Sequence, residues 1–412
     1  MFTDIKPSAP DPIMSLMEAY LQDTNPQKVN LGIGLYYDEC GNIPLLQAVH
    51  QAEQRLLTEK QPHGYPPIEG SAAFSQQVQA LLLGIAAEQQ YLATVQTLGG
   101  SGALKLAADF LYHYLHRREI WVSDPTWANH HAIFSGAGLQ VNSYHYFDNL
   151  SGELLFTDMQ NTLSTLPEGT PVLLHACCHN PTGTDLNKAQ WQALLTLIQK
   201  QRLLPLFDIA YQGFSNGLDE DCYALRIALE TDLDFIIANS FSKNMALYGQ
   251  RTGGLTIRCT GINTVTNVKG ALKTLVRRSY SCPPTHGSKI VEMLLSDDTL
   301  YHQWRNELAE MRERIKQIRL RLAAGLEQGG SALDYQRISV QRGMFSYTGL
   351  NEQQLAELRQ RYAIYLVSPG RMCLTGLNNG NIDYVISAIL DVTRSPSVIT
   401  GKAGNDERSE TF

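Results

Sequence analysis

A lysine follows an apolar run at the end of one expected strand. Lys243 lies in NSFSKNMALYGQRTGG (239–254), directly after DLDFIIA (232–238). Because burying an ammonium group is costly, a solvated loop lysine is the simpler interpretation. A desolvated lysine, however, has a lowered pKa, and its amine can attack a carbonyl to form a Schiff base. The second interpretation requires complementary groups elsewhere in the chain.

A glycine-rich turn follows another apolar run. GGSGALK (99–105) comes directly after ATVQTL and opens into a helical pattern, so its free N–H groups suit a phosphate. The turn lacks the GK[ST] of a P-loop and the third glycine of GxGxxG. Ala103 stands where a nucleophile elbow around Ser101 requires glycine, which argues against a serine hydrolase. We therefore expect a phosphate site here.

Three further strand ends carry polar or aromatic side chains. LPLFDIAYQGF (204–214) places Asp208 at a strand end, with Tyr211 three residues later. An aspartate can simply stabilise a turn, but a carboxylate facing a pyridine nitrogen keeps that nitrogen protonated, as a pyridoxal cofactor requires. Asn180 in HNPTG either forms a turn or binds a ring oxygen of the cofactor, and Trp127 in DPTWANH either joins the core or covers a ring.

Two arginines complete the set of candidate ligand-binding groups. Arg251 and Ser240 flank Lys243 in sequence and could reach a phosphate, whereas Arg371 in SPGRM could bind a carboxylate through its planar fork. Each residue alone is a weak signal. Their joint occurrence after strands and turns favours a pyridoxal phosphate site over a surface lysine.

Alternating strands and helices must bring these residues together. Short apolar runs, many of them rich in β-branched or aromatic residues, predict strands, and ALKLAADFLYHYL and AQWQALLTLIQKQ predict amphipathic helices between them. The runs are ATVQTL, EIWVSD, VNSYHYF, PVLLHACC, LPLFDIA, LDFIIANS and GGLTIRC. The alternation predicts parallel βαβ units, whose ligands bind at the carboxyl ends of the strands.

The same patterns divide the chain. We expect an N-terminal arm over 1–45, a large domain over 46–310, a smaller α+β domain over 311–394 and a disordered tail over 395–412. A long helix is expected from about Asp297 to Gln328. PIMSLMEAYLQD, within the arm, predicts a helix that packs with the C-terminal unit.

Composition narrows the class of protein. The formal charge of −7 over 412 residues gives no basic surface for nucleic acid. No stretch is apolar enough to cross a bilayer and the start lacks a signal peptide, so we expect a cytoplasmic protein. Seven scattered cysteines indicate reduced thiols. HACCH (175–179) is the best metal candidate, but adjacent cysteines in an extended segment point to opposite faces, so we expect no metal site.

Several of these motifs occur together in a known family. HNPTG, DIAYQGF and SFSK followed by R-x-G-G resemble the class I aminotransferases of fold type I. VNLGIGLYYDE, QTLGGSGALK, RRSYSCPP, QRGMFSYTGL and GRMCLTGLN follow in the family's order, so the resemblance covers almost the whole chain. In detail the chain is most similar to bacterial aromatic-amino-acid (tyrosine) aminotransferases, with aspartate aminotransferases close behind.

The resemblance implies a fold, a cofactor and a set of roles. It implies a mostly parallel seven-stranded sheet flanked by helices, a smaller α+β domain, and a homodimer whose active sites bind pyridoxal 5′-phosphate. Lys243 would form the Schiff base and then move the α-proton, and Asp208, supported by His130, would pair with the ring nitrogen. The remaining cofactor contacts would be Tyr211, Asn180, Trp127, Gly100, Ser101, Ser240 and Arg251, with Tyr65 from the partner subunit.

The resemblance also implies the substrates. Gly34 and Arg371 would bind the α-carboxylate with Trp127 and Asn180 nearby, and Arg277 would reach the distal carboxylate from the partner subunit. From the residues alone, the better-supported interpretation of Arg277 is a helix-end arginine beside Arg278 that bonds last-turn carbonyls. Tyrosine, phenylalanine or aspartate would donate the amino group to 2-oxoglutarate. An aspartate aminotransferase, a serine hydrolase using Ser101 and a non-catalytic binding protein are the alternatives.

Three departures from the family pattern affect the substrate and the partner contacts. Cys282 precedes the proline pair, Pro369 precedes Gly-Arg, and the loop before Tyr65 is short. These positions leave the preferred amino donor and the reach of Tyr65 open, while the residues that carry the chemistry are all present.

Overall fold

The computed structural model describes residues 2–4, 11–60, 62–84, 86–87, 90–149, 151–331 and 335–394. At its centre lies a seven-stranded sheet. Its strands in spatial order are β2 (Tyr91–Leu98), β8 (Thr252–Cys259), β7 (Phe235–Ser240), β6 (Leu204–Ile209), β5 (Pro171–His175), β3 (Glu119–Asp124) and β4 (Gln140–His145). Six strands of this sheet run in one direction and β8 runs in the opposite direction, so the expectation of a mostly parallel sheet is confirmed.

Side chains of the central strands alternate between two cores. In β5, Val172 and Leu174 pack into one core while Leu173 packs into the other. In β6, Phe207 and Leu206 divide in the same way. A strand covered on both faces must be apolar at every position, which explains the nearly continuous apolar runs of the sequence.

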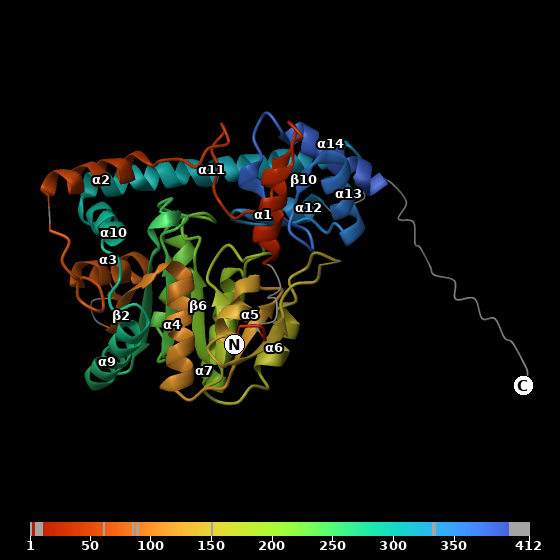
Figure 1. Cartoon of the computed structure of the whole chain (residues 1–412). Helices are drawn as coiled ribbons and strands as arrows, with labels where there is room; N and C mark the ends of the chain where they lie inside the picture. The colour runs from red at the N-terminus through yellow and green to blue at the C-terminus, as the bar shows by residue number, and fades with distance from the viewer. Residues whose placement is uncertain are drawn as a thin grey trace, which may run out of the picture.

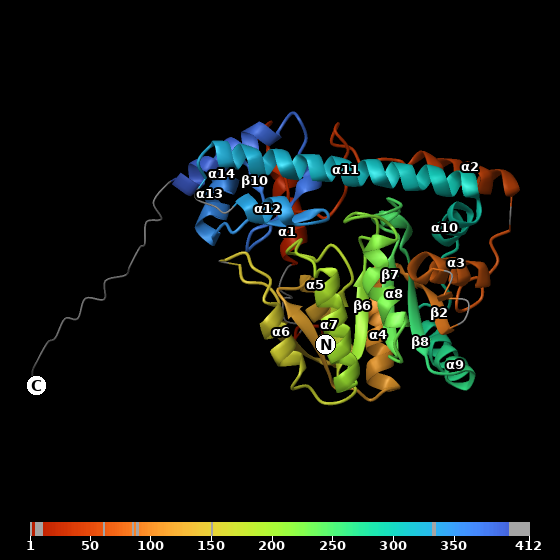
Figure 2. The ribbon, with the colours of Figure 1, turned by 180° about the vertical axis from the view of Figure 1, so that it is seen from behind.

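Helices cover both faces of the sheet. One face carries α4 (Gly99–His113), α5 (Ala128–Ser135) and α9 (Ile262–Ser279), which lie toward the viewer in Figure 1. The other face carries α3 (Ala72–Leu83), α6 (Phe156–Leu163), α7 (Lys188–Gln201) and α8 (Tyr223–Leu229), as the view from behind in Figure 2 shows. The strands and the two amphipathic helices expected from the sequence are confirmed.

The longest helix, α11 (Asp298–Gln328), runs along one end of the sheet (Figure 1). Its first turn is capped by Asp297, whose carboxylate accepts a hydrogen bond from the Leu300 amide at 2.9 Å. One half of α11 packs against α2 (Gln47–Glu59) and α10 (His286–Ser296), and the other half against α12 (Tyr335–Val340) and α14 (Ile382–Arg394). The helix therefore connects the sheet layers to the C-terminal elements.

The C-terminal elements form a smaller α+β group. Its remaining members are β9 (Phe345–Tyr347), α13 (Glu352–Tyr362), β10 (Ile364–Tyr365) and β11 (Arg371–Cys373), with β9 and β11 antiparallel. The N-terminal segment packs here: β1 (Val29–Asn30) pairs with β10, and the Tyr20 ring of α1 (Pro12–Gln22) lies 5.5 Å from the Tyr365 ring. The N-terminal helix thus packs where its sequence predicts.

The domain limits expected from the sequence stay a prediction. The limit at residue 310 falls within α11, which continues through it without a break. The expected tail, residues 395–412, lies outside the described residues. In the described part of the chain, no helix combines the length and the apolar character needed to span a membrane.

Candidate active site

A cavity lies at the carboxyl ends of the parallel strands, where the sheet meets the smaller α+β group. Most of the site residues expected from the sequence line it: Gly34, Gly100, Ser101, Trp127, Asn180, Asp208, Tyr211, Ser240, Lys243, Arg251 and Arg371. They come from segments more than three hundred residues apart. Most of them lie at or after strands of the central sheet that end at this edge, whereas Gly34 and Arg371 come from segments of the smaller α+β group.

Lys243 lines this cavity and is partly buried. Its Nζ lies 5.3 Å from the centre of the Tyr211 ring. Burial lowers the pKa of Lys243 to about 8, although the Asp208 carboxylate acts in the opposite direction. At pH 7 about a tenth of the amine is then neutral, far more than for an ordinary lysine, and the neutral form is the one that attacks a carbonyl. The solvated-loop interpretation is wrong.

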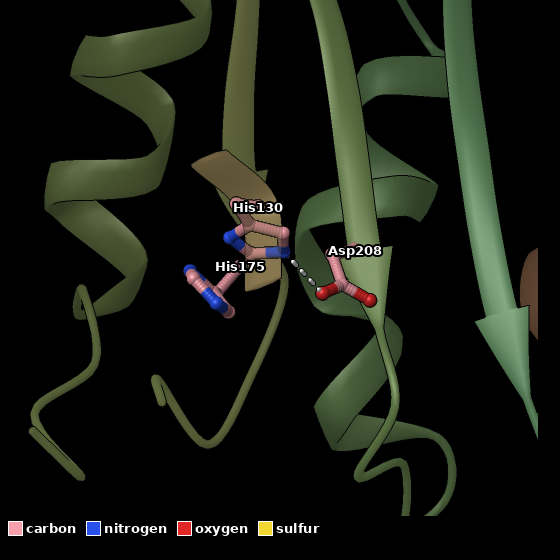
Figure 3. Close-up of side chains that lie close together, drawn as sticks. All are labelled: His130, His175 and Asp208. Atoms are coloured by element: carbon pink, nitrogen blue, oxygen red, sulfur yellow. Dashed lines mark hydrogen bonds and ion pairs between the residues drawn. The ribbon is translucent and has the colours of Figure 1, made fainter. Parts of the chain in front are cut away.

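Asp208 is held by a histidine behind it. The Nε2 atom of His130 lies 3.1 Å from Oδ2 of Asp208 (Figure 3). Nδ1 of His130 lies 2.8 Å from the Thr126 hydroxyl. Burial has the largest single effect and raises the pKa of Asp208, but the His130 hydrogen bond together with the electrostatic effects of His130, His175 and Lys243 lowers it by more, so the net pKa is lowered. Asp208 therefore presents a carboxylate to the cavity at neutral pH.

The glycine-rich turn opens α4 at the cavity wall. Gly99 has a φ of 67°, in the left-handed region where side chains are strained. A Cβ on Gly99 would lie 2.8 Å from Nη2 of Arg251, and a Cβ on Gly100 would lie 3.2 Å from Cβ of Ser240. The missing side chains leave the first N–H groups of α4 open to an anion.

Arg251 faces this turn from the loop after β7. Its Nη1 donates to the Tyr248 carbonyl at 3.0 Å and to the Ser242 hydroxyl at 3.4 Å. The Ser240 hydroxyl in turn lies 3.1 Å from that of Ser242. A guanidinium, two hydroxyls and a helix N-terminus converge here, as a phosphate monoester requires.

Arg371 occupies the opposite side of the cavity, on β11. Its Nη2 donates to the Gly32 carbonyl at 2.6 Å and its Nη1 to Oδ1 of Asn180 at 3.3 Å. The guanidinium lies 4.5 Å from the centre of the Phe345 ring. Its Nε is buried and has no hydrogen-bond partner among the described residues. A charged, incompletely paired guanidinium in a cavity suits a carboxylate ligand.

Close packing shapes the floor and walls of the cavity. Gly34 lies against Phe345, where a Cβ on the glycine would meet the ring at 3.0 Å. Trp127 precedes α5, and its ring stands edge-on to His130 at 5.2 Å. Trp127, Tyr211 and Asn180 thus surround the space between Lys243 and Asp208.

Two expected site residues lie elsewhere on this chain. Tyr65 is 96% exposed and Arg277, near the end of α9, is also exposed. Neither lines the cavity. Arg277 makes no hydrogen bond or ion pair with another described residue, so the helix-end interpretation, bonding to last-turn carbonyls, gains no support. Their contribution from a partner subunit stays a prediction.

The structure adds residues that the sequence reasoning missed. Ser242, Phe345 and His175 line the cavity, and Thr126 binds His130. Ser242 lies one residue before Lys243 in SFSK, so proximity in sequence was an available signal. Thr126 lies four residues before His130, so that contact is also local. Phe345 and His175 depend on tertiary packing, since His175 at the end of β5 lies 5.3 Å from His130 of α5 between ring centres.

The HACCH segment differs from its expected geometry. β5 ends at His175, and Cys178 has a φ of 50°, so the two cysteines are not extended. The assumption that their side chains point to opposite faces is therefore wrong. The two histidines of the segment make other contacts. His175 lies beside His130, and His179 forms hydrogen bonds with the hydroxyls of Ser123 and Thr182.

Comparison with known proteins agrees with this geometry. A family model described as Aminotransferase class I and II matches residues 26–389. The chain belongs to this aminotransferase family. It is 46% identical to the aromatic-amino-acid aminotransferase of Escherichia coli strain K12, over 95% of this chain and 100% of the relative.

Solved aminotransferase structures share the whole fold. The aromatic-amino-acid aminotransferase from Burkholderia pseudomallei, covalently bound to pyridoxal phosphate, superposes with a TM-score of 0.93 at 43% identity. It matches over 96% of this chain and 100% of its own. The psychrophilic aromatic amino acid aminotransferase from Psychrobacter sp. B6, cocrystallised with aspartic acid, gives a TM-score of 0.94 at 44% identity over the same shares. The expected fold type of this aminotransferase is confirmed.

Proposed function

We propose that this aminotransferase moves the amino group of an aromatic amino acid, tyrosine or phenylalanine, or of aspartate to 2-oxoglutarate, using pyridoxal 5′-phosphate in a ping-pong reaction. One observation carries the proposal: a partly buried lysine with a pKa lowered to about 8 shares a cavity with a buried, ionised aspartate. A lysine whose pKa lies close to neutral pH, beside a specific charged partner in a cavity, is typical of acid–base catalysis.

The cavity fits the cofactor at both ends. The turn at Gly100 and Ser101, the hydroxyls of Ser240 and Ser242, and the Arg251 guanidinium would hold the phosphate. A Cβ on Gly100 would lie 3.2 Å from Cβ of Ser240, so the glycine keeps open the space that the phosphate would occupy. At the other end, the carboxylate of Asp208 would face the ring nitrogen. When bound, the cofactor supplies an electron sink for the bond that breaks at the substrate α-carbon.

The remaining ring contacts come from three side chains. Tyr211 and Asn180 would bind the ring hydroxyl oxygen, and Trp127 would cover the ring face. Burial raises the pKa of Tyr211, so its phenol stays protonated and can donate a hydrogen bond. Asn180 also accepts from Arg371, which couples the ring contact to the carboxylate site.

Lys243 carries the proton transfer. Its Nζ would take the α-proton of the substrate and then donate a proton to a different atom of the reacting molecule. The lowered pKa suits this role because the amine must be neutral to accept a proton near neutral pH. His130 holds Asp208 in place through its Nε2 hydrogen bond.

The substrate carboxylate would bind at Arg371. The Nη2 and Nη1 bonds to Gly32 and Asn180 fix the plane of the guanidinium, and Phe345 lies against it. Gly34 keeps the approach open. These contacts orient any amino acid in the same way, so they do not distinguish aromatic from acidic side chains.

We further propose a homodimer in which Tyr65 and Arg277 reach the active site of the partner subunit. Both are exposed on the single chain, and Arg277 lacks a partner among the described residues. The division into a large domain and a small domain that closes over substrate belongs to the same proposal. So does a cytoplasmic location, because all seven cysteines are unpaired.

Aspartate as the main amino donor is the second candidate. A similar aromatic amino acid aminotransferase was cocrystallised with aspartic acid, so one site of this type accommodates both kinds of ligand. The serine hydrolase alternative lacks support: no histidine within the described ranges hydrogen-bonds Ser101, which instead lies beside the proposed phosphate site.

A panel of amino acids tests the proposal. Each would be added to the cofactor-loaded enzyme without an acceptor, and the rate of loss of the cofactor's visible absorbance would be measured. We expect tyrosine, phenylalanine and aspartate to react and 2-oxoglutarate to restore the absorbance. Failure of every amino acid would refute the proposal, and reaction of aspartate alone would favour the second candidate.

Arg277→Ala tests the distal contact, with the adjacent exposed Arg278→Ala as its control. Losing a buried charge-assisted pair costs roughly 2–5 kcal/mol, so kcat/KM for dicarboxylic substrates should fall by about 30-fold or more. The tyrosine and phenylalanine half-reactions should change by less than about tenfold. Equal losses for both classes would show that Arg277 acts structurally.

A further inference from the structure

Two adjacent thiols and a carboxylate converge behind the active-site cavity. Ligand atoms of Cys177, Cys178 and Asp221 all lie within 4.8 Å of one another, and all three residues are buried. The proposed transamination uses none of them. Thiolates and carboxylates within this distance are the ligands of zinc-like cations.

The backbone fixes this convergence. Cys178 has a φ of 50°, which turns its side chain away from the alternating pattern of a strand. Asp185 holds that conformation, since its carboxylate accepts the amides of Cys178 and His179 at 2.8 Å each. A Cβ on Gly343 would lie 2.8 Å from Sγ of Cys178, so only glycine leaves room for the thiol there.

The carboxylate of Asp221 keeps capacity for one more ligand. Its Oδ2 accepts the amides of Gly213 at 2.8 Å and Ser215 at 3.0 Å, and its Oδ1 accepts the amide of Asn216 at 2.8 Å. A carboxylate offers about four lone-pair positions, so one position remains on Oδ1. The three amide bonds also hold the carboxylate still, as a ligand needs.

The cluster is reachable from two sides. Cys177 lines the active-site cavity and also a second cavity that it shares with Asp221. The wall of the second cavity includes the exposed residues Asn187, Lys188 and Glu220. A small hydrated ion can therefore approach Cys177 and Asp221 from the surface without crossing the substrate site.

We propose that Cys177, Cys178 and Asp221 bind one soft divalent cation of the Zn²⁺ or Cd²⁺ type. Two metal–sulfur bonds and one metal–oxygen bond form, each thiol loses its proton to the solvent, and water fills the fourth position. No electron is transferred. The occupied site carries one net negative charge, and the buried Arg319 guanidinium, which interacts electrostatically with Cys178, offsets it.

Binding should also slow transamination. Sγ of Cys178 lies 3.8 Å from the Tyr211 carbonyl, and Cys177 forms part of the active-site wall. An ion bound to both thiols would shift the segment that carries Tyr211. This consequence rests on the proposed function, whereas the metal site itself does not.

Direct binding measurements test the site. The cofactor-loaded full chain would be dialysed against Cd²⁺ in a non-chelating buffer, and bound ion and released protons would be counted per chain. We expect one tightly bound Cd²⁺ and two released protons. Cys177→Ser and Cys178→Ser should each weaken binding by about a hundredfold or more, since even outer contacts of metal ligands contribute 10–100-fold.

Cys259→Ser is the matched control. Cys259 is another buried thiol, on β8, whose Sγ lies 3.8 Å from the Ile257 carbonyl and away from the cluster. This variant should retain the tight ion. Three results would each overturn the site. The first is one bound Cd²⁺ per chain in both cluster variants, the second is the same loss of Cd²⁺ affinity in Cys259→Ser as in the cluster variants, and the third is no saturable Cd²⁺ binding in the parent. If Cys178→Ser does not fold, Cys177→Ser decides.

The outcomes separate the site from the proposed function. Normal transamination with no Cd²⁺ binding would remove the metal site and leave the function. Tight binding of one Cd²⁺ per chain in a protein that reacts with no amino acid would support the metal site and refute the proposed function.

Discussion

Replacing Lys243 by methionine should make the cofactor-free protein more stable. The lysine is partly buried, and the loss of solvent around its amine lowers its pKa from 10.5 to about 8. Below the folded pKa the protein must therefore keep an ammonium group in a poorly solvated place. Methionine has a similar length and no charge, so it should fill the same space without this cost.

The size of the effect follows from the pKa. Each pKa unit corresponds to about 1.36 kcal/mol, so a shift from 10.5 to about 8 corresponds to about 3 kcal/mol. We therefore expect the Lys243→Met protein to exceed the parent by about 2–4 kcal/mol in free energy of unfolding at pH 7. Most single substitutions destabilise, so a gain of this size is distinctive.

The pH dependence gives a sharper signature. Between pH 8 and 10.5 the unfolded chain binds more protons at Lys243 than the folded chain does. Stability of the parent should therefore rise with pH across this window relative to the variant. The difference between the two proteins should be constant below about pH 7, shrink from pH 8 upward, and vanish above about pH 10.5.

Urea unfolding of both cofactor-free proteins at one protein concentration would measure this difference. Lys200→Met on α7 is the control, because Lys200 is exposed. That variant should stay within about 0.5 kcal/mol of the parent at every pH. A Lys243→Met protein that is less stable than the parent at pH 7, or a difference that does not change with pH, would refute the burial argument.

Three further substitutions test the site. Asp208→Ala should reduce the rate of the tyrosine half-reaction by several orders of magnitude, and a rate within about tenfold of the parent would remove its role at the ring nitrogen. Gly100→Ala places a methyl 3.2 Å from Cβ of Ser240, so the dissociation constant of pyridoxal phosphate, measured by equilibrium dialysis, should rise by about tenfold or more. Arg371→Lys removes the planar fork that reaches Asn180, so KM should rise by about tenfold or more for tyrosine and aspartate alike.

The sheet could be predicted because its signal is local. Strands covered on both faces need apolar residues at every position, and β5 to β7 show this directly in the sequence. Strand direction is different, because a buried antiparallel strand such as β8 has the same apolar pattern as a parallel one. Only pairing with β2 and β7 decides it.

The candidate site could be predicted where its residues follow strands. Lys243 and Asp208 lie at or just after strand ends, so the topology alone brings them to one edge. His175 and Phe345 act through contacts with His130 and Arg371. These contacts join residues far apart in the sequence and depend on tertiary packing, which no local pattern in the sequence encodes.

Backbone conformation limited the prediction at the cysteine pair. An alternating strand pattern separates adjacent side chains, but the left-handed φ of Cys178 brings its thiol to the side of Cys177. The two amide bonds to Asp185 that stabilise this turn come from a residue seven positions later. A single non-glycine residue in this conformation has no reliable sequence signal.

The two central groups of the cavity show how one environment can keep one group charged while favouring the neutral form of another. Burial disfavours the charged form of both Lys243 and Asp208. Asp208 and, more weakly, Cys373 oppose this cost at Lys243, while Arg251 and Arg371 add to it, so the pKa of Lys243 falls. Asp208 has the His130 hydrogen bond in addition to positive neighbours, so its pKa falls as well and the carboxylate stays ionised. The His130 contact thus allows a fixed anion and an amine that loses its proton near pH 8 to share one buried cavity.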